Sequence, residues 1–297
     1  MRATLSRLLI EAAEADARVM ILTCDHGYAL FDEFRKRRPE QFLNCGIAEQ
    51  NMVGVAAGLA KAGFRPVVYG LAAFVPIRVL EQIKLDVCHG KLPVIFLGDG
   101  AGLVYSTLGA SHQCFEDVAA LRALPDISIF SPADRFELMW SFSRARSSNG
   151  PSYIRLGKAD LGDIHSEPLA ADFDDCLYPV VKGSSTHLCF AAGAMVSIAK
   201  RAIDKSGLSY DLYSVPNLTI NPKHIVRLCG GREKILVVEE HSRHGGLGSL
   251  VAEAIAGKVV CRFEIMGTQH SFTKECGSYQ HLLAQHGLDV ESVQKML

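Results

Sequence analysis

The sequence lacks an excess of charge of either sign. Its 297 residues include 31 Lys and Arg against 32 Asp and Glu, which gives a formal net charge of −1. Proteins that bind nucleic acid or anionic membrane surfaces usually carry a basic patch or a strongly positive balance. The charge balance therefore gives no indication of either kind of partner.

Long uncharged apolar runs are also missing. The N-terminal segment 1–22 is interrupted by Arg7, Glu11, Glu14 and Asp16. A membrane-spanning helix needs about 20 predominantly apolar residues, and a signal peptide needs an unbroken apolar region. The sequence predicts neither of these, and we expect a cytoplasmic protein.

The nine cysteines are odd in number and show no C-x-x-C spacing. Several of them, such as Cys189 and Cys261, lie in apolar runs that are typical of buried strands. This distribution favours reduced thiols packed as small hydrophobic side chains over a disulfide or zinc framework. The eleven histidines are equally dispersed, without H-x-H or H-x-x-x-H pairs, so we predict no metal site in this chain.

What the sequence does contain is an alternation of short apolar runs with amphipathic segments. This alternation is typical of an α/β protein with mostly parallel strands. We expect strands at 19–23, 66–71, 93–98, 127–132, 152–157, 186–193, 210–216, 234–240 and 259–267. Between the fifth and sixth of these strands the pattern lapses.

The lapse divides the chain into two predicted domains. We expect two doubly wound, mostly parallel-sheet domains at 1–163 and 186–297. The intervening segment 164–185 is acidic, contains two prolines and has no sustained period, so it is predicted to be a linker.

Residues 42–60, FLNCGIAEQNMVGVAAGLA, are the most informative stretch. Glu49 lies at the expected start of a helix whose remaining face is small and apolar. The helix dipole stabilises an acid at this end by about 0.3–1 kcal/mol, so Glu49 alone could be a structural residue. Its sequence context favours a functional role.

The run GIAEQNMVGVAAGLA closely resembles a motif of the pyrimidine-binding domain that transketolases share with deoxyxylulose-phosphate synthases. The resemblance implies that Glu49 hydrogen-bonds N1′ of the aminopyrimidine of thiamine diphosphate and thereby activates this cofactor. A carboxyl group in an apolar setting can share a proton with a ring nitrogen, because burial disfavours its charged form. We therefore predict that Glu49 is both catalytic and cofactor-binding.

The resemblance extends over nearly all of the chain and implies further cofactor contacts. Phe74 matches an aromatic ring that stacks on the aminopyrimidine, although by itself it could be a core phenylalanine. Leu71 and Ile77 are expected to line the same pocket. Asp25 matches an acid close to the cofactor and the subunit junction.

The resemblance also implies substrate contacts. His112 matches a histidine that faces the reacting carbons of the sugar and can move a proton, so we predict it as catalytic and substrate-binding. Arg155, in SYIRLG, matches an arginine that holds the phosphate of the acceptor through a bidentate contact. The segment 186–297 resembles the transketolase C-terminal domain, whose role in the family is mainly architectural.

One departure from the family concerns the substrate. An acidic pair normally precedes the glycine before the substrate histidine, and here Thr107 and Leu108 take its place. A basic residue expected near Asp99 or Gly100 is also absent. Leu108 in the substrate site cannot accept a hydrogen bond from a sugar hydroxyl, so we expect a changed preference. A deoxy sugar, an unusual ketose and a pathway-specific acceptor all remain possible.

The sequence also lacks a diphosphate-binding domain. The tripeptide Gly98-Asp99-Gly100 cannot supply its metal motif, because the next asparagine is Asn149, and it is predicted to be a tight turn. The chain starts directly in the pyrimidine domain. We therefore expect the N-terminal, diphosphate-binding subunit of a split transketolase as partner, in a heterotetramer of two copies of each chain. That subunit would bind Mg²⁺ or Ca²⁺ and share thiamine diphosphate with this chain.

Three functions follow from these patterns. The first is the C-terminal subunit of a thiamine diphosphate-dependent transketolase, which transfers a two-carbon ketol unit between a ketose and an aldose. The second is a deoxyxylulose-phosphate synthase-like enzyme or the β subunit of a 2-oxo acid dehydrogenase. The third is a non-catalytic partner that stabilises a thiamine enzyme, but a scaffold would not need Glu49, Phe74 and His112 together.

Overall fold

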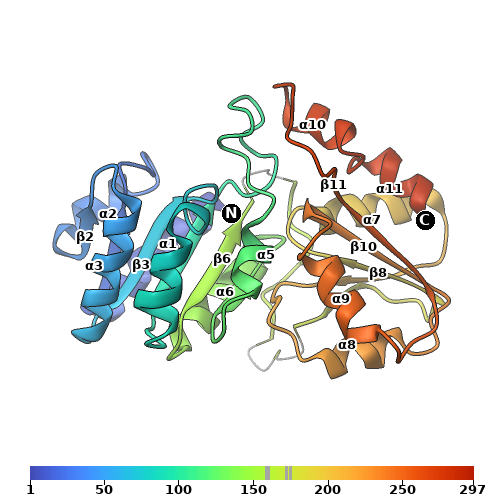
Figure 1. Cartoon of the computed structure of the whole chain (residues 1–297), viewed down its shortest axis with the longest axis horizontal. Coiled ribbons are helices and arrows are strands. Elements are labelled where there is room, and N and C mark those ends of the chain that lie inside the picture. Colours follow the sequence, from blue (N-terminus) through green and yellow to red (C-terminus); the bar gives the residue numbers. More distant parts are fainter. Residues whose placement is uncertain (158–160, 171–172, 174–175) are drawn as a thin grey trace.

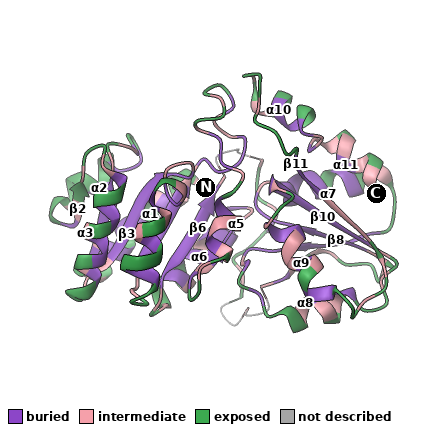
Figure 2. Ribbon diagram, viewed as in Figure 1, coloured by how far each residue is buried: buried purple, intermediate pink, exposed green. Residues whose placement is uncertain are grey.

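The computed structural model describes residues 1–157, 161–170, 173 and 176–297. Two sheets with flanking helices lie side by side, one in the blue-to-green half of the chain and one in the yellow-to-red half (Figure 1). The strands of both sheets are largely buried, and the outer faces of the helices are exposed (Figure 2). This architecture confirms the predicted α/β fold with two mostly parallel sheets.

The first sheet has six strands among the described residues, in the order β2-β1-β3-β4-β6-β5, and every neighbouring pair is parallel. Parallel strands covered on both faces consist of near-continuous apolar runs, which explains why the sequence revealed most of them. The strands are β1 (Val19–Thr23), β2 (Phe42–Asn44), β3 (Arg65–Leu71), β4 (Ile95–Asp99), β5 (Ser128–Phe130) and β6 (Ser152–Leu156).

Helices cover both faces of this sheet because successive strand residues point to opposite sides. In β3, Val67 and Tyr69 join one apolar cluster with α1 and α6, whereas Val68 joins another with α3. The helices of this half are α1 (Arg2–Ala15), α2 (Asp32–Arg37), α3 (Glu49–Lys61), α4 (Leu80–Gln82), α5 (Asp117–Arg122) and α6 (Arg135–Ser147). Three further helical segments are η1 (Pro39–Gln41), η2 (Ile77–Val79) and η3 (Ile83–Cys88).

The second sheet has the order β11-β10-β8-β9-β7, with only the β7–β9 pair antiparallel among the described strands. Its strands are β7 (Tyr178–Val181), β8 (His187–Ala191), β9 (Asp211–Ser214), β10 (Lys234–Ser242) and β11 (Arg262–Thr268). Its helices are α7 (Met195–Ser206), α8 (Pro222–Cys229), α9 (Leu247–Ile255), α10 (Tyr279–Gln285) and α11 (Val290–Met296). Cys189 in β8 is fully buried, as expected for a cysteine packed as a small hydrophobe.

Strand β7 lies within segment 164–185, for which we predicted a linker. It is a four-residue edge strand that contains Pro179 and is only partly buried, so it lacks the apolar alternation by which strands are recognised. The second sheet therefore begins before residue 186. Residues 171–172 and 174–175 of the predicted linker lie outside the described residues.

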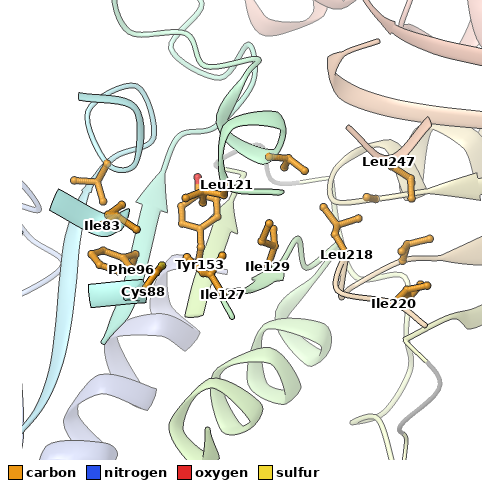
Figure 3. Packing of buried hydrophobic residues seen from close by; sticks show 14 of the residues in the cluster. Ile83, Cys88, Phe96, Leu121, Ile127, Ile129, Tyr153, Leu218, Ile220 and Leu247 are labelled. Carbon is orange, nitrogen blue, oxygen red and sulfur yellow. The ribbon is translucent and has the colours of Figure 1, made fainter. Parts of the chain in front are cut away.

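The two halves share one apolar layer. Ile127 and Ile129 of the first half belong to the same buried cluster as Leu218 and Ile220 of the second, and Figure 3 shows the four side chains along one line. Burial of such a shared layer favours a fixed arrangement of the two sheets. In the described part of the chain, no helix is long and apolar enough to cross a membrane.

Candidate active site

Glu49 is the first residue of α3, after the loop that follows β2. Its side chain is only 10% exposed, and its Oε1 accepts a hydrogen bond from Arg78 Nη1 at 2.9 Å. A carboxylate removed from water to this extent requires a charged or hydrogen-bonding partner. The structure therefore supplies Glu49 with a partner that the sequence analysis had not predicted.

Arg78 also contacts Phe74. Its guanidinium carbon lies 4.0 Å from the centre of the Phe74 ring, while nearly half of the Arg78 side chain remains exposed. The backbone N–H of Arg78 donates to the carbonyl of Phe74, so the turn 74–78 brings the two residues together. An arginine four residues after a phenylalanine was the sequence signal that could have suggested a cation–π contact.

His112 also contacts Phe74. The ring centres are 5.7 Å apart and meet edge to face, and His112 Nδ1 lies 2.9 Å from Ser111 Oγ. The structure thus brings together three of the predicted residues, with Arg78 added to them. Glu49, Arg78, Phe74 and His112 form one continuous series of contacts.

Leu71 and Ile77 flank the turn that carries Phe74. Leu71 is the last residue of β3, is buried, and accepts the backbone N–H of Phe74 at its carbonyl. Ile77 begins η2 and packs against a small buried cluster that includes Ala101. Both positions are therefore close to Phe74 in the fold.

Asp25 follows β1, is exposed, and adopts a left-handed backbone with φ of 46°. Its carboxylate accepts hydrogen bonds from Tyr28 Oη at 2.8 Å and from Asn44 Nδ2 at 3.4 Å. Asp25 and Asn44 stand at the carboxyl ends of the neighbouring strands β1 and β2. Ligands gather at this edge of parallel sheets.

The loop 103–113 carries both His112 and Leu108. Leu108 is 52% exposed and presents an apolar side chain to solvent. At the strand end below this loop, Tyr105 Oη donates to Asp99 Oδ2 at 3.1 Å, and His26 Nε2 lies 3.6 Å from the same oxygen. The sequence predicted a tight turn at Asp99 and neither of these contacts.

Arg155 lies in the interior of the protein. Its side chain is 8% exposed, and its Nε donates to the fully buried Asp117 at 2.8 Å. Its Nη2 donates to the backbone carbonyls of Glu240 at 2.8 Å and Cys114 at 3.3 Å. The guanidinium of Arg155 therefore faces the interior and is bonded to protein groups, which does not support the predicted contact with a substrate phosphate.

The two domain families of transketolases match this chain. The transketolase pyrimidine-binding domain matches residues 1–163, and the transketolase C-terminal domain matches residues 180–293. The chain belongs to the transketolase family.

Within the described residues, no group of three or more His, Cys, Asp or Glu side chains could hold a metal ion.

Individual relatives within the transketolase family differ in length. A subunit of the apulose-4-phosphate transketolase of Phocaeicola vulgatus is 30% identical, and the alignment covers 99% of this chain and 95% of that protein. The 6-deoxy-6-sulfo-D-fructose transketolase subunit SqwH of a Clostridium species is 28% identical, with 99% and 92% covered. A 1-deoxy-D-xylulose-5-phosphate synthase of Lawsonia intracellularis is 32% identical, but this chain spans only 46% of its length.

Solved transketolase structures show the same two-sheet fold. A split-gene transketolase, described as an inactive β4 tetramer, superimposes with a TM-score of 0.87 at 30% identity, covering 99% of this chain and 95% of that one. The transketolase of Campylobacter jejuni superimposes with a TM-score of 0.80 at 18% identity, over 99% of this chain and 46% of that one. The second likeness concerns the fold alone.

Proposed function

We propose that this chain is the C-terminal subunit of a split, thiamine diphosphate-dependent transketolase that transfers a two-carbon ketol unit from a ketose to an aldose. The observation that carries the proposal is the buried carboxylate of Glu49 at the head of α3, in one series of contacts with Phe74 and His112. Relatives named as transketolase subunits, of which the chain spans 92–95%, support a subunit rather than a complete enzyme.

The residues present fit the aminopyrimidine of the cofactor. The Arg78 guanidinium is a planar group with N–H donors, and it bonds to Glu49 while lying over the face of Phe74. A planar aminopyrimidine that stacks on Phe74 and shares a proton with Glu49 would use the same two kinds of contact. The partner subunit would hold the diphosphate and its Mg²⁺ or Ca²⁺.

Thiamine diphosphate, when bound, would supply the carbon nucleophile of the reaction. Glu49 would hold the shared proton at the pyrimidine nitrogen, and Phe74 would orient the ring. Ser111 Oγ, at 2.9 Å from His112 Nδ1, orients the imidazole so that Nε2 can exchange a proton with a substrate hydroxyl. Leu71, Ile77 and Asp25 would complete the surroundings of the cofactor.

The substrate is proposed to be a non-standard sugar or sugar phosphate. Leu108 is exposed on the loop next to His112 and presents an apolar surface in place of an acid. An apolar wall does not favour a hydroxyl over a hydrogen or a bulkier substituent at that carbon. The names of relatives that act on apulose 4-phosphate or 6-deoxy-6-sulfofructose support an unusual substrate.

The N-terminal transketolase subunit is the proposed partner, in a heterotetramer of two copies of each chain. Ile47, two residues before Glu49, is 83% exposed, and Tyr28 and Leu43 are also exposed. Such exposed apolar groups beside a functional carboxylate favour burial by another chain. The cytoplasmic location stays a prediction.

The test is reconstitution with the N-terminal transketolase subunit of the same organism. We expect ketol transfer to an aldose acceptor by the pair, no turnover by the lone chain, and at most weak thiamine diphosphate binding by the lone chain. Robust ketose cleavage by the lone chain would refute the split enzyme.

The second candidate is a deoxyxylulose-phosphate synthase-like enzyme, which the 32% identity to such synthases favours. Decarboxylation of pyruvate by the reconstituted pair would support this reaction over ketol transfer.

A further inference from the structure

The loop 103–113, which presents His112 and Leu108, is attached through a narrow base. Gly102 N–H donates to the Cys114 carbonyl at 2.8 Å, and Cys114 N–H donates to the Gly102 carbonyl at 3.2 Å. Between these two residues the loop forms turns without a helix or strand. Its conformation therefore depends on the groups that hold its base and its sides.

Glu240, from β10 of the second sheet, holds one side of this base. Its side chain is buried, and Oε1 accepts the backbone N–H of Leu103 at 2.6 Å. Oε2 accepts the Tyr279 hydroxyl at 2.8 Å. A buried carboxylate bonded in this way fixes its donors, since losing either bond leaves a buried polar group unpaired.

The close approach of Glu240 to the loop requires a glycine. Gly102 has φ of 76°, and a β-carbon at this position would lie 2.4 Å from Glu240 Oε1. The other side of the base is held by Arg155, which donates to the carbonyls of both Cys114 and Glu240. Glu240 and Arg155 thus clamp the two chain segments that enter and leave the loop.

A second C-terminal segment reaches the loop further along. Gly277 N–H donates to the Ser106 carbonyl at 3.3 Å, two residues before Tyr279 begins α10. Figure 1 shows the green loop extending to the side of the red segment that leads into α10. The second domain therefore contacts the loop at its base through Glu240 and midway through Gly277.

We propose that Glu240 and Tyr279 are positioning residues for the transketolase reaction, through which the C-terminal domain sets the conformation of the loop that presents His112 to the sugar. This assigns the C-terminal domain a part in substrate binding, beyond an architectural role. The clamp itself is independent of the reaction, but its effect on the sugar rests on the proposed function.

Tyr279→Phe is the most conservative test, since it removes only the hydroxyl that bonds to Glu240. Tyr210→Phe is the matched control, because the Tyr210 hydroxyl makes a similar bond at 2.7 Å to the Leu297 carbonyl, away from the loop. Glu240→Ala is a second variant that removes both bonds to the carboxylate.

Hydrogen exchange of the reconstituted complex gives the structural readout. In Tyr279→Phe we expect exchange of peptides spanning 103–113 to rise about 3- to 10-fold, which corresponds to the loss of one hydrogen bond, and more in Glu240→Ala. Exchange of strand β3 should stay unchanged in Tyr279→Phe, and Tyr210→Phe should leave the loop unchanged. Unchanged loop exchange in both Tyr279→Phe and Glu240→Ala would overturn the proposal.

Kinetics give the functional readout. We expect KM for the sugar to rise and kcat to fall by similar factors of about 3 to 10 in Tyr279→Phe, with an unchanged apparent affinity for thiamine diphosphate. Faster loop exchange with unchanged KM and kcat would overturn the positioning role while leaving the transketolase assignment intact. If the wild-type pair transfers no ketol unit, the proposed function fails, and hydrogen exchange still tests the clamp.

Discussion

At the scale of single residues, the main feature is the pairing of Glu49 with Arg78. The pair is half-exposed on the Arg78 side and buried on the Glu49 side, and it lies against Phe74. In the proposed complex the aminopyrimidine would compete with Arg78 for the Glu49 carboxylate. The pair therefore connects the chemistry of Glu49 to the binding of the cofactor.

Replacing Glu49 by Gln should abolish ketol transfer by the reconstituted pair, with a loss of about 100-fold or more, because an amide cannot take up the shared proton. Assembly with the partner should be retained. Steady-state kinetics and size-exclusion chromatography measure the two effects. Glu33→Gln, an exposed acid of α2, is the control, and near-wild-type activity of Glu49→Gln would contradict its role.

Replacing Arg78 by Met should strengthen binding of thiamine diphosphate to the reconstituted pair by at most about fivefold. The reason is that a partly exposed ion pair contributes roughly 0.2–1 kcal/mol and competes with the cofactor for Glu49. Calorimetric titration measures the Kd, with the exposed Lys84→Met as control. Weaker binding by Arg78→Met would show that Arg78 assists the cofactor and does not compete with it.

At the scale of secondary structure, the residue that caps the start of α6 also binds a distant segment of the chain. Asp134 is its N-cap and accepts the backbone N–H groups of Phe136 and Glu137. The same side chain also accepts from the backbone and ring of the buried His165. One carboxylate therefore links the helix to a segment about 30 residues later in the chain.

This network predicts a pH dependence of stability. Burial alone would raise the pKa of Asp134, but hydrogen bonds from His165 and from backbone N–H groups outweigh it and lower this pKa to about 2. A lowered pKa means that the ionised form stabilises the fold above about pH 4, and that this contribution is lost as the pH falls towards 2. The lowered pKa corresponds to a contribution of Asp134 to the free energy of unfolding on the order of 2 kcal/mol.

The urea midpoint of Asp134→Asn should therefore lie below that of the wild type above pH 4, and the difference should shrink between pH 4 and 2. Asp32→Asn, on the surface of α2, should show a much smaller difference. A difference in urea midpoint between Asp134→Asn and the wild type that does not depend on pH would contradict the assigned role of the Asp134 charge.

At the scale of the whole molecule, the exposed Ile47 beside Glu49 belongs to the proposed interface with the N-terminal subunit. Ile47→Glu should weaken binding of the N-terminal subunit by at least about tenfold, because a charge would be buried without a partner. Analytical ultracentrifugation of the mixed subunits measures this effect. Val260→Glu, a fully exposed apolar site in the second half, is the control, and equal effects of both substitutions would argue against this interface.

The sequence by itself determined the parallel α/β pattern and the helix that begins at Glu49. These features depend on local periodicity and on residues a few positions apart, which a linear reading can detect. Strand β7 was not predicted, because an edge strand that is partly exposed and contains Pro179 does not show the apolar alternation of a buried strand.

Only the tertiary structure decided that Arg155 is an interior residue, that Arg78 pairs with Glu49, and that Glu240 holds Leu103. The last two contacts join residues 29 and 137 positions apart. Whether an arginine faces a substrate or a buried carboxylate depends on which distant segments pack around it, and its own sequence neighbours do not encode that packing.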